Sequence, residues 1–228
     1  MKLLEPPSAA ELATSDFKEF CEITQDYFDR VDQEEVVNSI TIDDLRAGIW
    51  RPYGFVAIHA FEESERDKRQ LRVHVWPEVT IEQLDDPEED HDLAHKHGAH
   101  LGGLALRNPY REHQVSTHEP DQTDEPYDSY ELRDGVWVPA AARAITVSPL
   151  IEYAPGSTHY MTFDAYHATS RTPCPLSITL VIRGGLLGPS GFLQPSGAGR
   201  PLTFPPEGPM PEAELAQVWQ DLNETRAA

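Results

Sequence analysis

The spacing of apolar residues divides the chain into a helical first part and a longer part built of short strands. Within residues 1–50, apolar side chains recur at the spacing of an amphipathic helix and are interleaved with acidic residues and lysine. Ser8 or Ser15 suits the N-cap of the first helix, and Thr41 suits the N-cap of a short helix in TIDDLRAGIW. Residues 1–50 are therefore predicted to form a helical extension.

After residue 51 the pattern changes to short runs of β-branched and aromatic residues that are separated by turn signals. Examples are FVAIHAF, LRVHVW and LSITLVIR, and Asp134-Gly135 is typical of a hairpin turn between two further runs. About ten such runs follow one another without a helix-length periodic segment. This pattern predicts an all-β sandwich or barrel over residues 51–185.

The remaining segment, residues 186–228, begins with many glycines and prolines and ends with a periodic stretch. The Gly/Pro-rich part predicts an irregular tail on the surface of the barrel. In PEAELAQVWQDLNE, Pro211 suits the first turn of a helix, and Leu215, Val218 and Leu222 form an apolar stripe. The chain is therefore predicted to end in a helix that packs on the barrel.

Composition narrows the range of partners. The 228 residues fit one large domain with extensions, and the net charge is −21 from 39 acidic and 18 basic residues. Such a charge repels nucleic-acid phosphates and anionic lipid surfaces, which excludes both as partners. The apolar runs are too short to span a bilayer, and no signal-peptide core is present. We expect a cytoplasmic protein with reduced thiols at Cys21 and Cys174, a small-molecule substrate and, as an open alternative, a homodimer.

Four of the ten histidines lie in the segment HDLAHKHGAH, residues 91–100. His95 and His97 are two positions apart, so they share one face of a strand. Neutral imidazole nitrogens bind first-row metals, but two of them need a third ligand from a neighbouring strand. His167, in FDAYHATS at the start of a predicted strand, is the best candidate. His91 belongs to the acidic segment before the strand and is expected to be solvated.

The segments around these histidines resemble the two motifs of the cupin superfamily. HKHGAHLGGLAL stands at the first motif, which carries His-x-His and, a few residues later, a glutamate. APGSTHYMTFDAYHATSRTPCPLSITLVIRG stands at the second, which carries one more histidine. The resemblance covers about residues 52–185. It implies a double-stranded β-helix, or jelly-roll barrel, with a metal held by His95, His97 and His167.

The chain departs from the cupin pattern at the glutamate, which would be expected near Leu101 or Gly102. Neither residue can bind a metal, and two alternatives follow. The site has a three-histidine face, as in the thiol dioxygenase and diketone-cleaving branches of the superfamily, or a local bulge turns His100 inward as a fourth ligand. Strict alternation along the strand points His100 away from the face of His95 and His97, which ranks it below the other three.

The run LRVHVW contributes further candidates for the site. Its Leu and Val residues form one face, and Arg72, His74 and Trp76 form the other. If the second face lines a cavity, Arg72 would clamp a substrate carboxylate, and His74 would act as a hydrogen-bond partner or as an acid or base. The alternative is a solvent-facing stripe. Tyr160 is a candidate for the same cavity lining, with packing as its alternative.

These residues predict a mononuclear metal enzyme. A three-histidine face leaves up to three positions of an octahedral ion open, so Fe(II) can hold a substrate and O2 together. Our first hypothesis is therefore an Fe(II) dioxygenase-like oxidoreductase that acts on a small polar, carboxylate-bearing molecule. Zn(II) or Ni(II) would instead serve as a Lewis acid in a lyase, isomerase, cyclase or bond-forming enzyme of secondary metabolism. A non-catalytic ligand-binding cupin is the third hypothesis.

Overall fold

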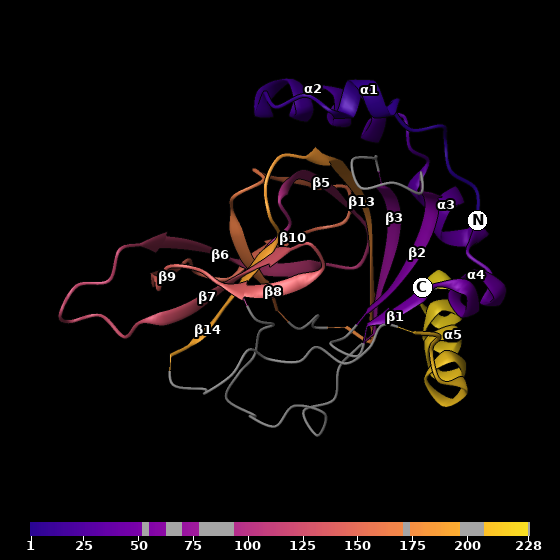
Figure 1. Ribbon diagram of the computed structural model, residues 1–228. Coiled ribbons are helices and arrows are strands. Elements are labelled where there is room, and N and C mark those ends of the chain that lie inside the picture. Colours follow the sequence, from indigo (N-terminus) through magenta and orange to yellow (C-terminus); the bar gives the residue numbers. More distant parts are fainter. Residues whose placement is uncertain (52–54, 63–69, 78–93, 171–173, 197–207, 228) are drawn as a thin grey trace.

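The computed structural model describes residues 1–51, 55–62, 70–77, 94–170, 174–196 and 208–227. Two antiparallel sheets form the body of the protein, and helices lie against one of them (Figure 1). In spatial order, the first sheet consists of β1 (Ile49–Arg51), β2 (Phe55–Glu62), β3 (Gln70–Pro77), β13 (Leu176–Leu186), β5 (Ala99–Arg107) and β11 (Thr158–Met161). The second consists of β10 (Ile151–Tyr153), β6 (Tyr110–His118), β12 (Tyr166–Thr169), β4 (His95–Lys96), β14 (Gly191–Pro195), β7 (Tyr127–Arg133) and β8 (Val136–Pro139), and β9 (Ala144–Val147) pairs with β6.

The path of the chain between the two sheets is that of a double-stranded β-helix. From β3 to β6 successive strands alternate between the first and the second sheet, and from β10 to β13 they alternate again. The core of the first sheet is thereby ordered β3-β13-β5-β11, and that of the second is ordered β10-β6-β12-β4. This is the arrangement of a jelly roll, in which two facing sheets are wound from one double ribbon. The predicted all-β, double-stranded β-helix fold is confirmed.

Two hairpins that the sequence pattern indicated are present, and turn chemistry explains the one between β7 and β8. β2 pairs antiparallel with β3, as the two apolar runs predicted. β7 and β8 are joined by Asp134 and Gly135, whose φ angles are 51° and 79°. Positive φ at both central residues matches the right-handed twist of the flanking strands, and Asp and Gly tolerate it best.

Five helices within the described residues frame the first sheet (Figure 1). They are α1 (Ala9–Leu12), α2 (Phe17–Phe28), α3 (Gln33–Ser39), α4 (Ile42–Ala47) and α5 (Glu212–Ala227). Ser8 and Thr41 form capping boxes at α1 and α4, as their positions predicted, whereas the N-cap of α2 is Asp16 rather than Ser15. None of the helices in the described part of the chain is long and apolar enough to cross a membrane.

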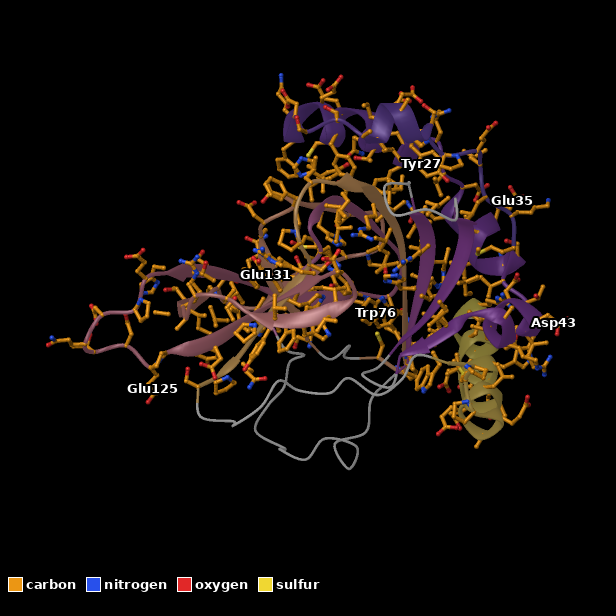
Figure 2. The ribbon with its side chains drawn as sticks, viewed as in Figure 1. Tyr27, Glu35, Asp43, Trp76, Glu125 and Glu131 are labelled. Carbon is orange, nitrogen blue, oxygen red and sulfur yellow. The ribbon has the colours of Figure 1, made fainter. Side chains whose placement is uncertain are left out.

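The main hydrophobic core lies between the outer face of the first sheet and these helices. Leu71, Val73 and Val75 of β3 are at most 1% exposed and pack in one cluster with apolar residues of the helices. Tyr27, labelled in Figure 2, belongs to the helical side of this cluster. Since the helices cover the outer face, the opposite face of β3 must point into the space between the sheets.

One prediction about the boundary of the barrel needs correction. The barrel was predicted to end at residue 185 and to be followed by an irregular tail. Instead, β13 continues to Leu186, and residues 191–195 form β14, which pairs with both β4 and β7. Phe192 and Leu193 are 1% exposed, so this short apolar run gains burial by joining the sheet. The glycines and prolines on either side of this run had led to the prediction of an irregular tail.

Candidate metal centre

Three histidines from two segments of the second sheet meet at one point. His95 in β4 is the direct cross-strand partner of His167 in β12, and His97 follows β4 by one residue. Gly98 then takes a φ of 67°, which turns the chain out of β4 and into β5 of the other sheet. One nitrogen from each of the three imidazoles lies within 4.8 Å of the others. The structure thus brings together the three predicted ligands.

The geometry of the cluster fits a divalent metal ion. His97 Nε2 and His167 Nε2 are 3.1 Å apart. Two imidazole nitrogens on one zinc ion, each at about 2.0–2.1 Å from it, are separated by about 2.8–3.4 Å at octahedral or tetrahedral angles. Burial first of all, and then the nearby groups His95, His167, Arg183 and Arg72, lower the pKa of His97 well below its usual value. The ring is therefore neutral at pH 7, as a metal ligand must be.

Glu112, in β6, orients one of these ligands. His167 Nδ1–H donates to Glu112 Oε2 over 2.9 Å, which leaves the Nε2 lone pair of His167 directed at the cluster. Glu112 is 0% exposed and also accepts hydrogen bonds from the hydroxyls of Tyr110 and Tyr153, both at 3.1 Å. Burial alone would raise its pKa, but the hydrogen bond and the electrostatic interaction with the His167 ring lower the pKa of Glu112 to about 2. The carboxylate is therefore ionised.

Sequence reasoning missed Glu112 because a glutamate in REHQVS is typical of an exposed strand position. A signal was nevertheless present. Tyr110 and Glu112 are two positions apart, so they share a face, and an aromatic residue such as Tyr110 is typical of the face that packs against other residues. A carboxylate held beside a metal-binding histidine is the usual outer-shell partner of such a ligand.

The inner face of β3 carries the other predicted candidates. Trp76 lies between the two sheets (Figure 2); its indole nitrogen donates to Thr179 Oγ1 over 3.0 Å, and its ring is 5.4 Å from that of Tyr110 in the second sheet. Arg72 is on the same face and close enough to lower the pKa of His97. His74, between them along the strand, packs at 4.6 Å against Phe55. The face of Arg72 and His74 therefore lines the interior and is not a solvent-facing stripe.

His159, in β11, is a further inner-face residue with the properties of an acid–base group. It is 8% exposed, and its ring stacks on Tyr110 at 5.2 Å. Gly103, its cross-strand partner, leaves room for the ring, because a Cβ at Gly103 would lie 2.0 Å from His159 Cε1. Among the described residues, His159 Nδ1 is a buried nitrogen without a hydrogen-bond partner.

Burial lowers the pKa of His159 to about 4, against the opposing influence of Glu112, and this makes stability depend on pH. The unfolded chain takes up a proton near pH 6.5, but the folded chain does so only near pH 4. Falling pH therefore favours unfolding within that window. Between pH 7 and pH 5 we expect metal-free protein to lose about 2 kcal/mol of unfolding free energy through this residue. Urea titrations of wild type and His159→Gln at both pH values measure it, and an equal loss in both proteins would contradict the assignment.

Comparison with known proteins finds only distant structural similarity. No protein-family model and no curated protein sequence matches the chain. Among solved structures, the DMSP lyase DddQ from Ruegeria pomeroyi is 15% identical, with a TM-score of 0.37, over 86% of this chain and 81% of that one. A Klebsiella pneumoniae protein with a double-stranded β-helix domain is 9% identical, with a TM-score of 0.36, over 68% and 96% of the two chains.

A third structure, hydroxypropylphosphonic acid epoxidase from S. wedmorenis, is 10% identical, with a TM-score of 0.35, over 64% of this chain and 60% of that one. The match therefore spans less than two thirds of the epoxidase chain. It also spans only 53% of the chain in another DMSP lyase structure. The strand order of the chain itself, with His95 and His167 meeting on adjacent strands, therefore carries the assignment of the fold. The chain has a double-stranded β-helix fold.

Within the barrel, Leu101 stands where the glutamate of the cupin motif would be expected, and His100 is not brought to the histidine cluster. Leu101 is the cross-strand partner of Arg183 and shares its inner face. His100, one residue earlier, points outward, where its ring lies 5.2 Å from Phe17. His100 Nδ1 accepts from the backbone N–H of Phe163 over 3.2 Å, and Nε2 lies 3.2 Å from the carbonyl of Ser15. No bulge turns His100 inward, so the structure favours the three-histidine alternative.

Tyr160 also lies outside the cupin interior. Its hydroxyl donates to Gln25 Oε1 of α2 over 2.8 Å, and its ring packs on the helix-covered core. The neighbouring residues His159 and Met161 occupy the inner face, so alternation places Tyr160 on the outer one. The prediction of Tyr160 as a catalytic residue is therefore not supported by its position. His91 lies outside the described residues.

Proposed function

We propose that the chain is a mononuclear metal enzyme of the cupin fold, and that it is an Fe(II)-dependent oxidoreductase acting on a small carboxylate-bearing molecule. The observation that carries the proposal is the meeting of His95, His97 and His167 in one cluster, which no carboxylate of the described residues joins. These three residues would hold the ion as neutral ligands and would leave positions for a substrate and O2.

When bound, a divalent ion would supply either a redox centre or a Lewis acid. The side chains around it favour an anionic substrate. The three ligands are uncharged, so the full charge of the ion remains, and the guanidinium groups of Arg72 and Arg183 add to the positive field at His97. Arg72 points into the interior from β3, where it can pair with a carboxylate. His74 is placed beside it to position a further polar group of the substrate.

Oxygen consumption tests the redox part of the proposal. Metal-free protein is loaded with Fe(II), Zn(II) or Ni(II) and mixed with a panel of small hydroxy-, amino- and thiol-carboxylates. We expect O2 uptake only with Fe(II) and only with some of the acids, and a strong loss of uptake in Arg72→Gln. Substrate turnover with Zn(II) or Ni(II) in the absence of O2 would contradict the oxidoreductase and favour a Lewis-acid enzyme.

A Lewis-acid lyase is the second candidate, and His159 favours it. This imidazole is neutral at pH 7, faces the interior and keeps an unpartnered Nδ1, so it can accept a proton from a bound substrate. Proton abstraction beside a metal-bound carboxylate is the chemistry of an elimination or isomerisation. In this case turnover would proceed under argon with Zn(II) and would fall by about 100-fold or more in His159→Gln, within the range of general-base catalysis.

A further inference from the structure

Arg183, near the end of β13, is a cation within the barrel, and none of the residues that the structure describes supplies an anionic partner for it. It follows Thr179 and Val181 on the inner face, while Ile178, Leu180 and Ile182 of the same strand are buried in the helix-covered core. Its terminal nitrogen Nη2 donates to the backbone carbonyl of His97 over 2.9 Å. Its Nε is buried and has no hydrogen-bond partner among the residues that the structure describes.

This arrangement is costly for the folded protein without a ligand. A guanidinium group removed from water is destabilising unless a counter-charge and full hydrogen bonding compensate for it. Burial lowers the pKa of Arg183, because removal from water disfavours the charged form. Within the described part of the chain, no carboxylate forms an ion pair with it. The carbonyl of His97 uses one N–H group and leaves the Nε donor unused.

The hydrogen bond to His97 places the Arg183 side chain beside the metal centre. The carbonyl that holds Arg183 belongs to a metal-binding histidine, and it also accepts from Ser190 Oγ over 2.8 Å, so its position is fixed by two donors. Arg183 and Arg72 act on His97 from adjacent strands of the first sheet. An anion between the metal and β13 would therefore meet both the ion and a guanidinium group.

We infer that Arg183 is a substrate-anchoring residue, whose guanidinium group binds a carboxylate of the substrate beside the three-histidine metal centre. The inference rests on the proposed function only for the metal ion beside Arg183. Carboxylate binding by Arg183 is independent of that ion and can be measured in metal-free protein. Together with Arg72, it predicts a substrate with two anionic groups or one carboxylate shared by two guanidinium groups. A neutral substrate would leave the guanidinium group of Arg183 without a counter-charge from the residues that the structure describes.

Anion-dependent thermal stability of metal-free protein tests the inference. The probes are acetate and malonate, with sodium chloride at equal ionic strength as the reference. In wild type we expect a higher melting temperature with the carboxylates than with chloride. In Arg183→Met the apparent affinity for malonate should fall about tenfold or more, a free-energy change of about 1.4 kcal/mol or more.

Arg107→Met is the matched control. Arg107 also donates to a backbone carbonyl, that of Thr225, at 3.2 and 2.7 Å from Nε and Nη2, but it lies at the contact of β5 with α5. This variant should melt at a lower temperature and bind malonate as wild type does. Arg183→Met should melt no lower than wild type without anions, because it removes an uncompensated cation. If Arg183→Met does not fold, Arg183→Gln serves in the same titration.

Two results would overturn the inference: equal malonate affinity in wild type and the Arg183 variant, or no stabilisation of wild type by carboxylates beyond that by chloride. The metal content of the same proteins distinguishes a failure of the proposed anchor from a failure of the proposed metal enzyme. Arg183→Met that keeps stoichiometric metal but loses malonate binding supports the anchor. Wild type that binds malonate but no metal would refute the metal enzyme and leave the anchor standing.

Discussion

The double variant His95→Ala/His97→Ala is expected to contain no stoichiometric metal after purification, whereas wild type does. Loss of two of three ligands leaves one imidazole, and the loss of affinity exceeds the roughly 10–100-fold that removal of an outer-shell partner alone costs. Elemental analysis of protein purified without added metal measures the effect. The variant should still fold, because His95 and His97 are only partly buried and neither belongs to the main hydrophobic core.

The control for this experiment is His100→Ala, which removes a histidine from the same short segment. His100 is 2% exposed and joins β5 to α2 and to Phe163, so we expect a loss of about 1–3 kcal/mol in unfolding free energy. Its metal content should equal that of wild type. Metal loss in a folded His100→Ala protein, or full metal content in the double variant, would contradict the three-histidine assignment.

Glu112→Gln is expected to weaken metal binding by about 10–100-fold without removing a ligand. The carboxylate accepts from His167, Tyr110 and Tyr153, whereas an amide offers one acceptor oxygen and places an NH2 group against one of these donors. His167 then loses the partner that fixes its tautomer. Competition with a chelator of known affinity measures the change in the dissociation constant.

Glu152→Gln controls for the loss of a glutamate from the same sheet. Glu152 pairs with Arg111 at 2.7 Å on the surface, and surface ion pairs contribute about 0–1 kcal/mol. Its metal affinity should equal that of wild type. If both variants bind metal equally well, Glu112 has only a structural role.

The parts of the site that were predictable from sequence follow from local geometry. His95 and His97 are two residues apart on extended chain, which makes a shared direction a property of the backbone. His167 was found because a third ligand had to come from another strand, and the cross-strand register places it directly opposite His95. Turn chemistry at Asp134-Gly135 and the alternation in LRVHVW similarly predicted a hairpin and a two-faced strand.

The parts that were missed depend on which face of a strand looks inward. Both faces of the first sheet are buried, one under helices and one inside the barrel, so hydrophobicity does not separate them. Tyr160 and His159 are adjacent in sequence, and the prediction chose the one that faces α2. Arg183 resembled the polar end of an apolar strand, and its inward direction follows only from the three-dimensional register with β5.

The most direct test of a metal centre formed by His95, His97 and His167 is anomalous diffraction from a crystal of the zinc-loaded protein, measured at the zinc edge. The account predicts one strong peak about 2.0–2.1 Å from a ring nitrogen of each of these three histidines. The absence of a peak there, or a peak bound to His100 or to surface carboxylates instead, would contradict it.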